Sequence, residues 1–194
     1  GLGGVYKSQI QHAAATGMIA YIGKVEYEGD TAIQRAYAQM PGVKPVTLCD
    51  DSPYLFLSPL NGDVFFISSY LGEKGGRICD LYLYRNGQKL RLAQNVQGTY
   101  DQGFAVSANG AYVVYASEET WGLVLQEVAS GKEQALASSD ANFTSSTVPM
   151  GVSNDGRLAY LLQGHRMYVL NTEEGSITPL FREEDEAAPD SWYR

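Results

Sequence analysis

The chain has 194 residues and a formal net charge of −8, from 22 acidic and 14 basic side chains. Nucleic acids and anionic membrane surfaces are therefore disfavoured as partners, because both are bound mainly through Lys and Arg. The length allows one domain or one array of small units, and a domain of this size buries roughly 70% of its unfolded surface. An apolar fraction of 44% argues against disorder, and 14 Tyr and 21 Gly beside 6 Phe and 4 Met favour strands over helices.

The sequence shows no targeting or membrane-spanning pattern. No stretch approaches the ~20 consecutive apolar residues that cross a bilayer, so direct membrane insertion is not expected. The N-terminal residues lack the basic and apolar regions of a signal peptide. The first four residues, GLGG, suggest a boundary inside a longer chain.

Cysteine and histidine are scarce. Cys49 and Cys79 have no Cys-x-x-Cys spacing, and we expect two partly buried free thiols, with one disulfide as the alternative. Only His12 and His165 supply imidazoles, and the four side chains do not follow the spacing of a zinc site. The sequence therefore predicts no metal and no cofactor.

A repeated unit runs along most of the chain. Its turn glycines are separated by 45, 48 and 46 residues, at Gly17, Gly62, Gly110 and Gly156. A short strand precedes each turn and an apolar strand follows it; a polar loop, an alternating strand, a tight turn and a closing strand complete the unit.

The expected strands, in chain order, fall into four copies. They span residues 18–22, 32–39 and 45–48; then 54–57, 63–67, 81–85 and 89–93; then 104–106, 111–116, 123–128 and 133–137; and finally 150–152, 157–162, 167–171 and 177–181. The units are expected at about 9–50, 51–97, 98–140 and 141–182, and an acidic tail follows at 183–194. We expect this tail, with its Glu-Glu-Asp-Glu block, to be a solvated linker; an acidic docking segment is the alternative.

The pattern of each unit predicts a four-stranded antiparallel sheet. Glycine at the turns accepts φ > 0, which lets the chain reverse within two residues. The strand after the turn is apolar at nearly every position, as in Val113-Val114-Tyr115, which indicates a sheet covered on both faces. Radial stacking of such sheets satisfies this requirement, and 40–50 residues is a propeller repeat length. We therefore expect an all-β fold, a β-propeller-like array of about four four-stranded antiparallel blades.

The pattern Ser-x-Asp/Asn-Gly, apolar strand, loop, Leu-x-Leu strand, glycine turn and closing strand resembles the TolB-type β-propeller repeat. The same repeat builds the propellers of prolyl oligopeptidases and many bacterial envelope proteins. The resemblance covers roughly residues 9–181 and is most specific in the third and fourth copies. TolB-type propellers usually close with six or more blades. Four copies therefore leave three alternatives: a compact ring, an open arc, or part of a larger ring completed by other residues or by a homo-oligomer. We favour the last.

Catalytic signals are weak in this sequence. The string Gly-Val-Ser-Asn-Asp at 151–155 lacks the final glycine of a nucleophile elbow, so Ser153 is interpreted as a turn residue. Four aspartates near the inter-blade connections could converge as paired carboxylates but are better explained as turn formers. They are Asp50, Asp51, Asp101 and Asp140.

Two further loop patterns are weaker still. The glycine-rich stretch 72–76 lacks the ending of a phosphate-binding loop and is expected to be a hairpin loop. The triplet Asn-Phe-Thr at 142–144 matches the glycosylation acceptor pattern, which is common by chance. No catalytic, cofactor-binding or metal-binding residue is predicted.

The function predicted from these observations is a non-catalytic binding or assembly module. Aromatic and polar residues in the connections are candidates for contact, although several could equally pack between blades: Tyr54, Tyr100, Gln102, Trp121 and Phe143. The TolB resemblance implies an extracytoplasmic domain, periplasmic or on the surface of a bacterium, that contacts a protein or a glycan. The alternative is an accessory propeller of a prolyl oligopeptidase-like serine hydrolase whose catalytic domain lies outside this chain.

Overall fold

The computed structural model describes residues 10–28, 31–71, 77–97, 103–137 and 147–180, and every regular element in these ranges is a β-strand. The strands are β1 (Ile10–Ala13), β2 (Met18–Glu28), β3 (Thr31–Gln39), β4 (Val46–Cys49), β5 (Leu55–Leu57), β6 (Val64–Leu71), β7 (Arg77–Arg85), β8 (Gln88–Ala93), β9 (Phe104–Val106), β10 (Tyr112–Ala116), β11 (Leu123–Glu127), β12 (Lys132–Leu136), β13 (Thr147–Val152), β14 (Leu158–Gln163), β15 (Arg166–Asn171) and β16 (Ile177–Pro179).

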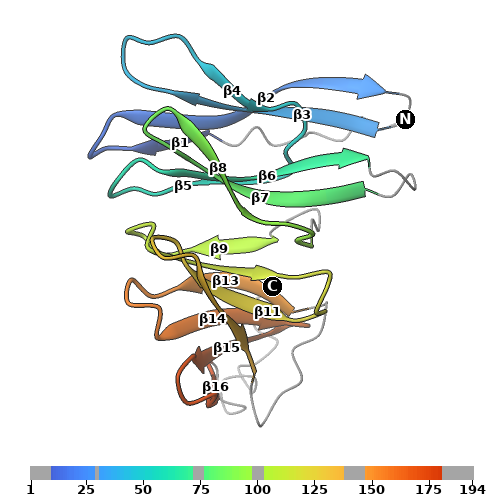
Figure 1. The fold of residues 1–194 in the computed structure, drawn as a ribbon, viewed down its shortest axis with the longest axis vertical. Helices are drawn as coiled ribbons and strands as arrows, with labels where there is room; N and C mark the ends of the chain where they lie inside the picture. The colour runs from blue at the N-terminus through green and yellow to red at the C-terminus, as the bar shows by residue number, and fades with distance from the viewer. Residues whose placement is uncertain (1–9, 29–30, 72–76, 98–102, 138–146, 181–194) are drawn as a thin grey trace, which may run out of the picture.

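The strands form four separate antiparallel sheets, each a meander of four consecutive strands. We call them sheet 1 (β1–β4), sheet 2 (β5–β8), sheet 3 (β9–β12) and sheet 4 (β13–β16). They stack face to face along the long axis of the molecule, with sheet 1 at one end and sheet 4 at the other (Figure 1). The prediction of an all-β array of four four-stranded units is confirmed.

The predicted turn glycines occupy the conformation that their residue type allows. Gly17, Gly62, Gly110 and Gly156 have φ between +68° and +77°, a region that residues with a Cβ rarely adopt. Each also has a close neighbour: a Cβ on Gly62 would lie 2.5 Å from the Thr16 hydroxyl oxygen of the neighbouring turn, and one on Gly17 would lie 2.6 Å from Pro41 of its own sheet. Glycine at these turns is thus required both by the backbone conformation and by the close packing around each turn.

The core lies between the sheets. One cluster joins sheets 1 and 2, around Ala20, Ala36 and Phe66. A second, which joins sheets 2 and 3, contains the fully buried side chains of Phe65 and Phe104. A third cluster lies between sheets 3 and 4 and includes Val114, Ala159, Leu161 and Leu170. Each sheet therefore obtains its interior from its neighbours.

Four sheets with three interfaces form an open arc. Within the described ranges no core cluster joins sheet 4 to sheet 1, and the two sheets lie at opposite ends of the stack (Figure 1). Of the alternatives left by the sequence, a compact four-blade ring is therefore not the arrangement observed.

Several strands extend beyond their predicted ends. β6 and β7 continue to Leu71 and back to Arg77, although the sequence predicted strands only at 63–67 and 81–85. The extension carries polar residues that still pair across the ladder, and Ser69 and Cys79 lie opposite each other with their Oγ and Sγ atoms 3.3 Å apart. β1 is the short strand expected ahead of the Gly17 turn, for which the sequence gave no bounds. In β6 and β7, the hydrogen-bonded pairing thus continues beyond the apolar residues from which the strands were predicted.

Candidate functional site

A cleft of about 310 Å³ opens at the outer edge between sheets 2 and 3. Its walls come from β8, from β10–β12 and from the β10–β11 loop: Arg91, Leu92, Ala93, Gln94, Tyr115, Ser117, Glu119, Thr120, Val124 and Glu133. The inter-sheet connection holds this region together, because the backbone of Val96 and Gln97 pairs with residues 116–117. The cleft is therefore built on a bridged junction of two blades.

One wall of the cleft carries a basic side chain, Arg91. Arg91 lies 3.6 Å from the carboxylate of Asp80, which is buried, while half of the arginine side chain remains exposed. With the amide of Gln94 turned so that its oxygen faces the guanidinium, that oxygen accepts hydrogen bonds of 2.8 and 2.6 Å from Arg91. Asp80 also accepts from the Tyr70 hydroxyl and the Asn95 backbone N–H. Asp80 and Gln94 thus hold the Arg91 guanidinium in place, and the exposed half of the Arg91 side chain lines the cleft.

The opposite wall is acidic. The Tyr115 hydroxyl donates a 2.9 Å hydrogen bond to the carboxylate of Glu133, and burial together with this bond raises the pKa of Tyr115. Gln126, which is 5% exposed, donates from its amide nitrogen to the Leu92 carbonyl oxygen at 3.3 Å. Its amide oxygen is buried without a hydrogen-bond partner. The Gln126 side chain beside the acidic wall therefore keeps one buried acceptor without a hydrogen bond.

Trp121 follows the cleft residues Glu119 and Thr120 in the β10–β11 loop. Its side chain is 66% exposed and its backbone φ is +54°. A positive φ is a genuine outlier for a bulky residue, and strain of this kind is concentrated at functional positions. An exposed, strained tryptophan beside a charged cleft is a candidate contact residue.

A second, smaller cleft of about 210 Å³ lies between sheets 3 and 4. Its charges are already paired in part: Arg157 lies 3.5 Å from Glu173, and Gln134 donates a 2.7 Å hydrogen bond to the Thr172 carbonyl oxygen. Both side chains of the ion pair are about two-thirds exposed. This cleft is a weaker candidate than the first.

Of the four aspartates considered from the sequence as paired carboxylates, the structure describes only Asp50 and Asp51. Asp50 is exposed and pairs with Arg35 at 3.2 Å, and Asp51 accepts a hydrogen bond from the Gln34 backbone N–H at 3.3 Å. Both serve the connection between sheets 1 and 2. Asp101 and Asp140 lie outside the described residues.

Other residues from the sequence analysis have clear positions. Ser153 accepts a hydrogen bond from the Leu158 N–H at 3.0 Å, as expected of a turn residue. Tyr54 is buried and packs edge-on against Phe104, so it is a core residue and not a contact residue. Cys49 and Cys79 are both buried and are not joined by a disulfide. His12 and His165 are exposed.

Some predictions fall where nothing is described: Tyr100, Gln102, the loop 72–76, the triplet 142–144 with Phe143, and the tail 183–194. In the described part of the chain, no three His, Cys, Asp or Glu side chains are grouped to hold a metal ion. The same residues contain no helix long and apolar enough to span a membrane.

Sequence reasoning named Trp121, which lies beside the larger cleft, but none of the residues that line the cleft. Tyr115 and Glu133 come from two strands of sheet 3, and Arg91 of sheet 2 joins them in one cleft only when the two sheets pack together. The only sequence signal of Arg91 and Glu133 is a charged residue on an edge strand, which by itself is typical of any solvated surface. Tyr115 lies on an inner strand, within an apolar run that gave no sign of a cleft.

Meandering four-stranded sheets that pack flank to flank define a β-propeller. Comparison with solved structures supports this assignment: the chain has the β-propeller fold, with four blades. No protein-family model matches its sequence, and no curated protein matches it.

Three solved structures are similar in fold. The β-propeller domain of the Trilobed protease from Pyrococcus furiosus, described as having an open velcro topology, aligns with a TM-score of 0.57 at 7% identity, over 90% of this chain and 58% of that one. The nidogen/laminin complex aligns at 0.53 and 13% identity, over 86% and 60%. TolB from Acinetobacter baumannii aligns at 0.52 and 10% identity, over 77% and 38%.

These likenesses confirm, at the level of the fold, the resemblance to TolB-type propellers that the repeat pattern predicted. This chain spans less than two thirds of the length of each of the three structures. Identities of this size carry the fold and not the activity.

Proposed function

We propose that this chain is a non-catalytic binding module that contacts a protein or glycan partner through the cleft between sheets 2 and 3. The observation that carries the proposal is the combination at one blade junction of a fixed, half-exposed Arg91, an acidic wall at Glu133 and an exposed Trp121. A guanidinium group and a carboxylate in one cleft favour a partner that offers both acceptors and donors.

The residue types favour a protein partner over a glycan. Trp, Tyr and Arg are the side chains that most often dominate the energy of protein interfaces, and charge complementarity sets their specificity. A cleft of about 310 Å³ accepts a short segment or a few side chains and not a whole domain. We therefore expect a loop or extended peptide of the partner to enter the cleft.

A library of phage-displayed peptides and a glycan array are the direct probes. We expect peptides to be selected and their binding to fall at least tenfold in Trp121→Ala and in Arg91→Ala. Leu60→Ala is the matched control, because Leu60 is 57% exposed in a turn and does not line the cleft. Peptide binding that all three variants retain, or binding to glycans alone, would contradict the protein-partner proposal. Turnover of generic ester, peptide or glycoside substrates by the purified chain would contradict the non-catalytic assignment.

The resemblance to TolB-type repeats also supports a place outside the cytoplasm, in the periplasm or at the cell surface. A reporter fused to the C-terminus of the parent protein tests this proposal. Alkaline phosphatase is active only after export, so an inactive phosphatase fusion that is present at normal levels would contradict it.

The alternative function is an accessory propeller of a serine hydrolase. The likeness to the propeller domain of a protease favours it. The reading frame of the parent gene separates the two: continuation into an α/β-hydrolase pattern with a Gly-x-Ser-x-Gly motif supports the accessory role, and its absence supports the independent binding module.

A further inference from the structure

The three interfaces between sheets are built in the same way, and the backbone hydrogen bonds show which residues correspond from one sheet to the next. A hydrogen bond closes each turn from the serine N–H to the carbonyl oxygen five residues on: Ser58 to Asp63, Ser107 to Tyr112 and Ser153 to Leu158, at 2.8–2.9 Å. Residues at the same distance from these serines are therefore equivalent in sheets 2, 3 and 4. In sheet 1, Ala13 and Met18 pair at the same spacing.

One face of each sheet packs on the sheet that follows in the chain. In sheet 2 this face carries Phe65, Ile67, Leu81 and Leu83, none more than 1% exposed, in the core shared with sheet 3. In sheet 3 it carries Val114, Ala116, Leu123 and Leu125, in the core shared with sheet 4. In both sheets, the face that packs on the following sheet is apolar and its residues come from the second and third strands of the sheet.

The corresponding face of sheet 4 is not covered by any sheet among the described residues. Its equivalent residues are Tyr160, Leu162, Met167 and Val169, from β14 and β15. All four are apolar, but all four are only partly buried, whereas their counterparts in sheet 2 are fully buried. We call this surface the trailing face.

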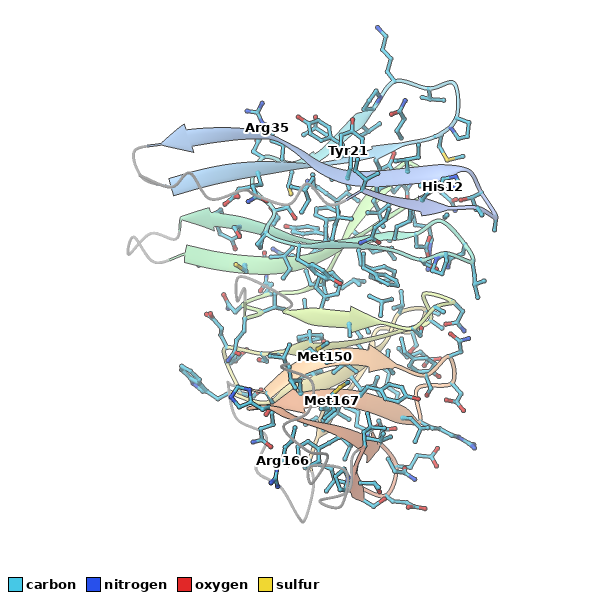
Figure 2. The ribbon with its side chains drawn as sticks, turned by 180° about the vertical axis from the view of Figure 1, so that it is seen from behind. His12, Tyr21, Arg35, Met150, Arg166 and Met167 are labelled. Atoms are coloured by element: carbon cyan, nitrogen blue, oxygen red, sulfur yellow. The ribbon has the colours of Figure 1, made fainter. Side chains whose placement is uncertain are left out.

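The other end of the stack carries the opposite half of the interface. In sheet 2, Phe66 and Tyr82 stack across the strands with ring centroids 5.6 Å apart, and they pack on the core shared with sheet 1. In sheet 1 the equivalent pair, Tyr21 and Tyr37, stacks in the same way at 5.1 Å. These rings belong to the face of sheet 1 turned away from sheet 2, which we call the leading face. Figure 2 labels Tyr21 on sheet 1 and Met167 on sheet 4, toward opposite ends of the stack.

We propose that the trailing face of one chain packs on the leading face of a second copy, and that two such contacts close a ring of two chains. Each contact repeats the internal blade interface, so it continues a surface already used three times in the molecule. Contacts of this head-to-tail kind generate a closed ring where the rotation permits.

A ring of two chains would contain eight blades, which lies within the roughly 4–8 blades that β-propellers typically have. Four blades match 58% and 60% of two solved propeller-containing structures. The arc therefore leaves about two fifths of each of these chains unmatched, and we take a second copy as the source of the further blades. The inference concerns the ends of the stack and does not depend on the cleft between sheets 2 and 3.

Mass measurement on the full 194-residue chain is the first test. Light scattering after size exclusion, and native mass spectrometry, are expected to give twice the chain mass of 21.2 kDa. A monomer throughout the micromolar range would overturn the proposal, and it would mean that any further blades come from a longer polypeptide and not from a second copy.

Complementation between two variants tests the geometry. Leu162→Asp places a charge on the trailing face and Tyr37→Asp places one on the leading face, and each alone is expected to raise the dimer dissociation constant by roughly 100-fold or more. Mixed together, the two variants retain one undamaged contact per pair, so a mixed dimer is expected to reappear. Leu60→Asp, a turn substitution away from both faces, is the control and should leave the dimer unchanged.

The mixture also guards against misfolding, because only folded variants can complement each other. Near-ultraviolet circular dichroism of each variant provides the independent check. A dimer that survives Leu162→Asp, or folded single variants that remain monomeric when mixed, would overturn the head-to-tail ring.

Discussion

Arg85 holds the carboxylate of Asp63 in an ion pair at the turn edge of sheet 2. Its Nε lies 2.9 and 3.0 Å from the two carboxylate oxygens, and a terminal nitrogen also contacts Oδ2. The Asp63 side chain is 5% exposed, so its charge is removed from water. The hydrogen bond to Asp63 raises the pKa of Arg85.

Arg85→Ala is expected to lower the free energy of unfolding by about 1–3 kcal/mol, because it leaves a buried carboxylate with only Asn61 as a side-chain donor. The matched control is Arg157→Ala, whose partner Glu173 is two-thirds exposed; exposed pairs of this kind contribute less than about 1 kcal/mol. Urea unfolding followed by tryptophan fluorescence measures both. Equal losses in the two variants would mean that burial of Asp63 does not govern the ion pair.

The turn glycines give a second prediction. Gly156 and Gly131 both have φ near +70°, so alanine at either position costs about 1–2 kcal/mol in backbone strain. A Cβ at Gly156 would also lie 2.7 Å from the Tyr112 ring, whereas one at Gly131 meets nothing within 4 Å. Gly156→Ala is therefore expected to have the lower melting temperature of the two by several degrees. Scanning calorimetry decides this, and similar melting temperatures would show that the Tyr112 ring moves aside freely.

The repeat could be predicted because its signals are local. A glycine at φ > 0 fixes each turn without reference to the rest of the fold, and Gly17, Gly62, Gly110 and Gly156 all have the expected conformation. The strand ends were less predictable, because pairing in β6 and β7 continues through polar residues that carry no apolar pattern.

The faces of the sheets could not be assigned from the glycines. The turn between Ser58 and Gly62 is one residue longer than the turn between Ser107 and Gly110. Counted from the glycine, Phe65 and Val113 have equal positions, yet Phe65 points toward the following sheet and Val113 toward the preceding one. A one-residue shift exchanges the two faces of a strand, and only the hydrogen-bonded register resolves it.

The candidate cleft was unpredictable for a different reason. Its charged residues are distant in sequence, and their proximity is a property of the packing between sheets 2 and 3. Even Trp121, whose exposure was considered from the sequence, gave no sign of its positive φ, because no glycine or asparagine occupies that position.

Neighbouring turns are linked by asparagines, which gives a third prediction. The Asn109 side-chain nitrogen donates to the Asn154 carbonyl oxygen at 3.1 Å, while its side-chain oxygen accepts from Ser107 and from the Ala111 N–H within its own turn. Asn109→Asp keeps the acceptor and removes the donor, so it isolates the bond between sheets 3 and 4. We expect a loss of about 1 kcal/mol in the free energy of unfolding, and hydrogen exchange should rise at the Asn154 turn.

The control for that prediction is the same chemical change in a hairpin. Asn86→Asp alters a turn within sheet 2, where Asn86 has a positive φ that aspartate also tolerates. If Asn86→Asp destabilises the protein as much as Asn109→Asp does, the link between turns contributes nothing specific.

The buried thiol of Cys49 predicts the behaviour of the protein at high pH. Burial raises the pKa of Cys49 from 9.0 to about 11, so the folded state favours the neutral thiol more strongly than the unfolded chain does. That contribution to stability is complete below pH 9 and is lost as the pH rises toward 11, at a total of about 3 kcal/mol. In Cys49→Ala the decline between pH 9 and 11 should be correspondingly shallower. Urea unfolding at a series of pH values measures the slope, which cancels the constant loss of packing in the variant. Parallel curves for the two proteins would show that Cys49 stays protonated, or titrates alike, in both states.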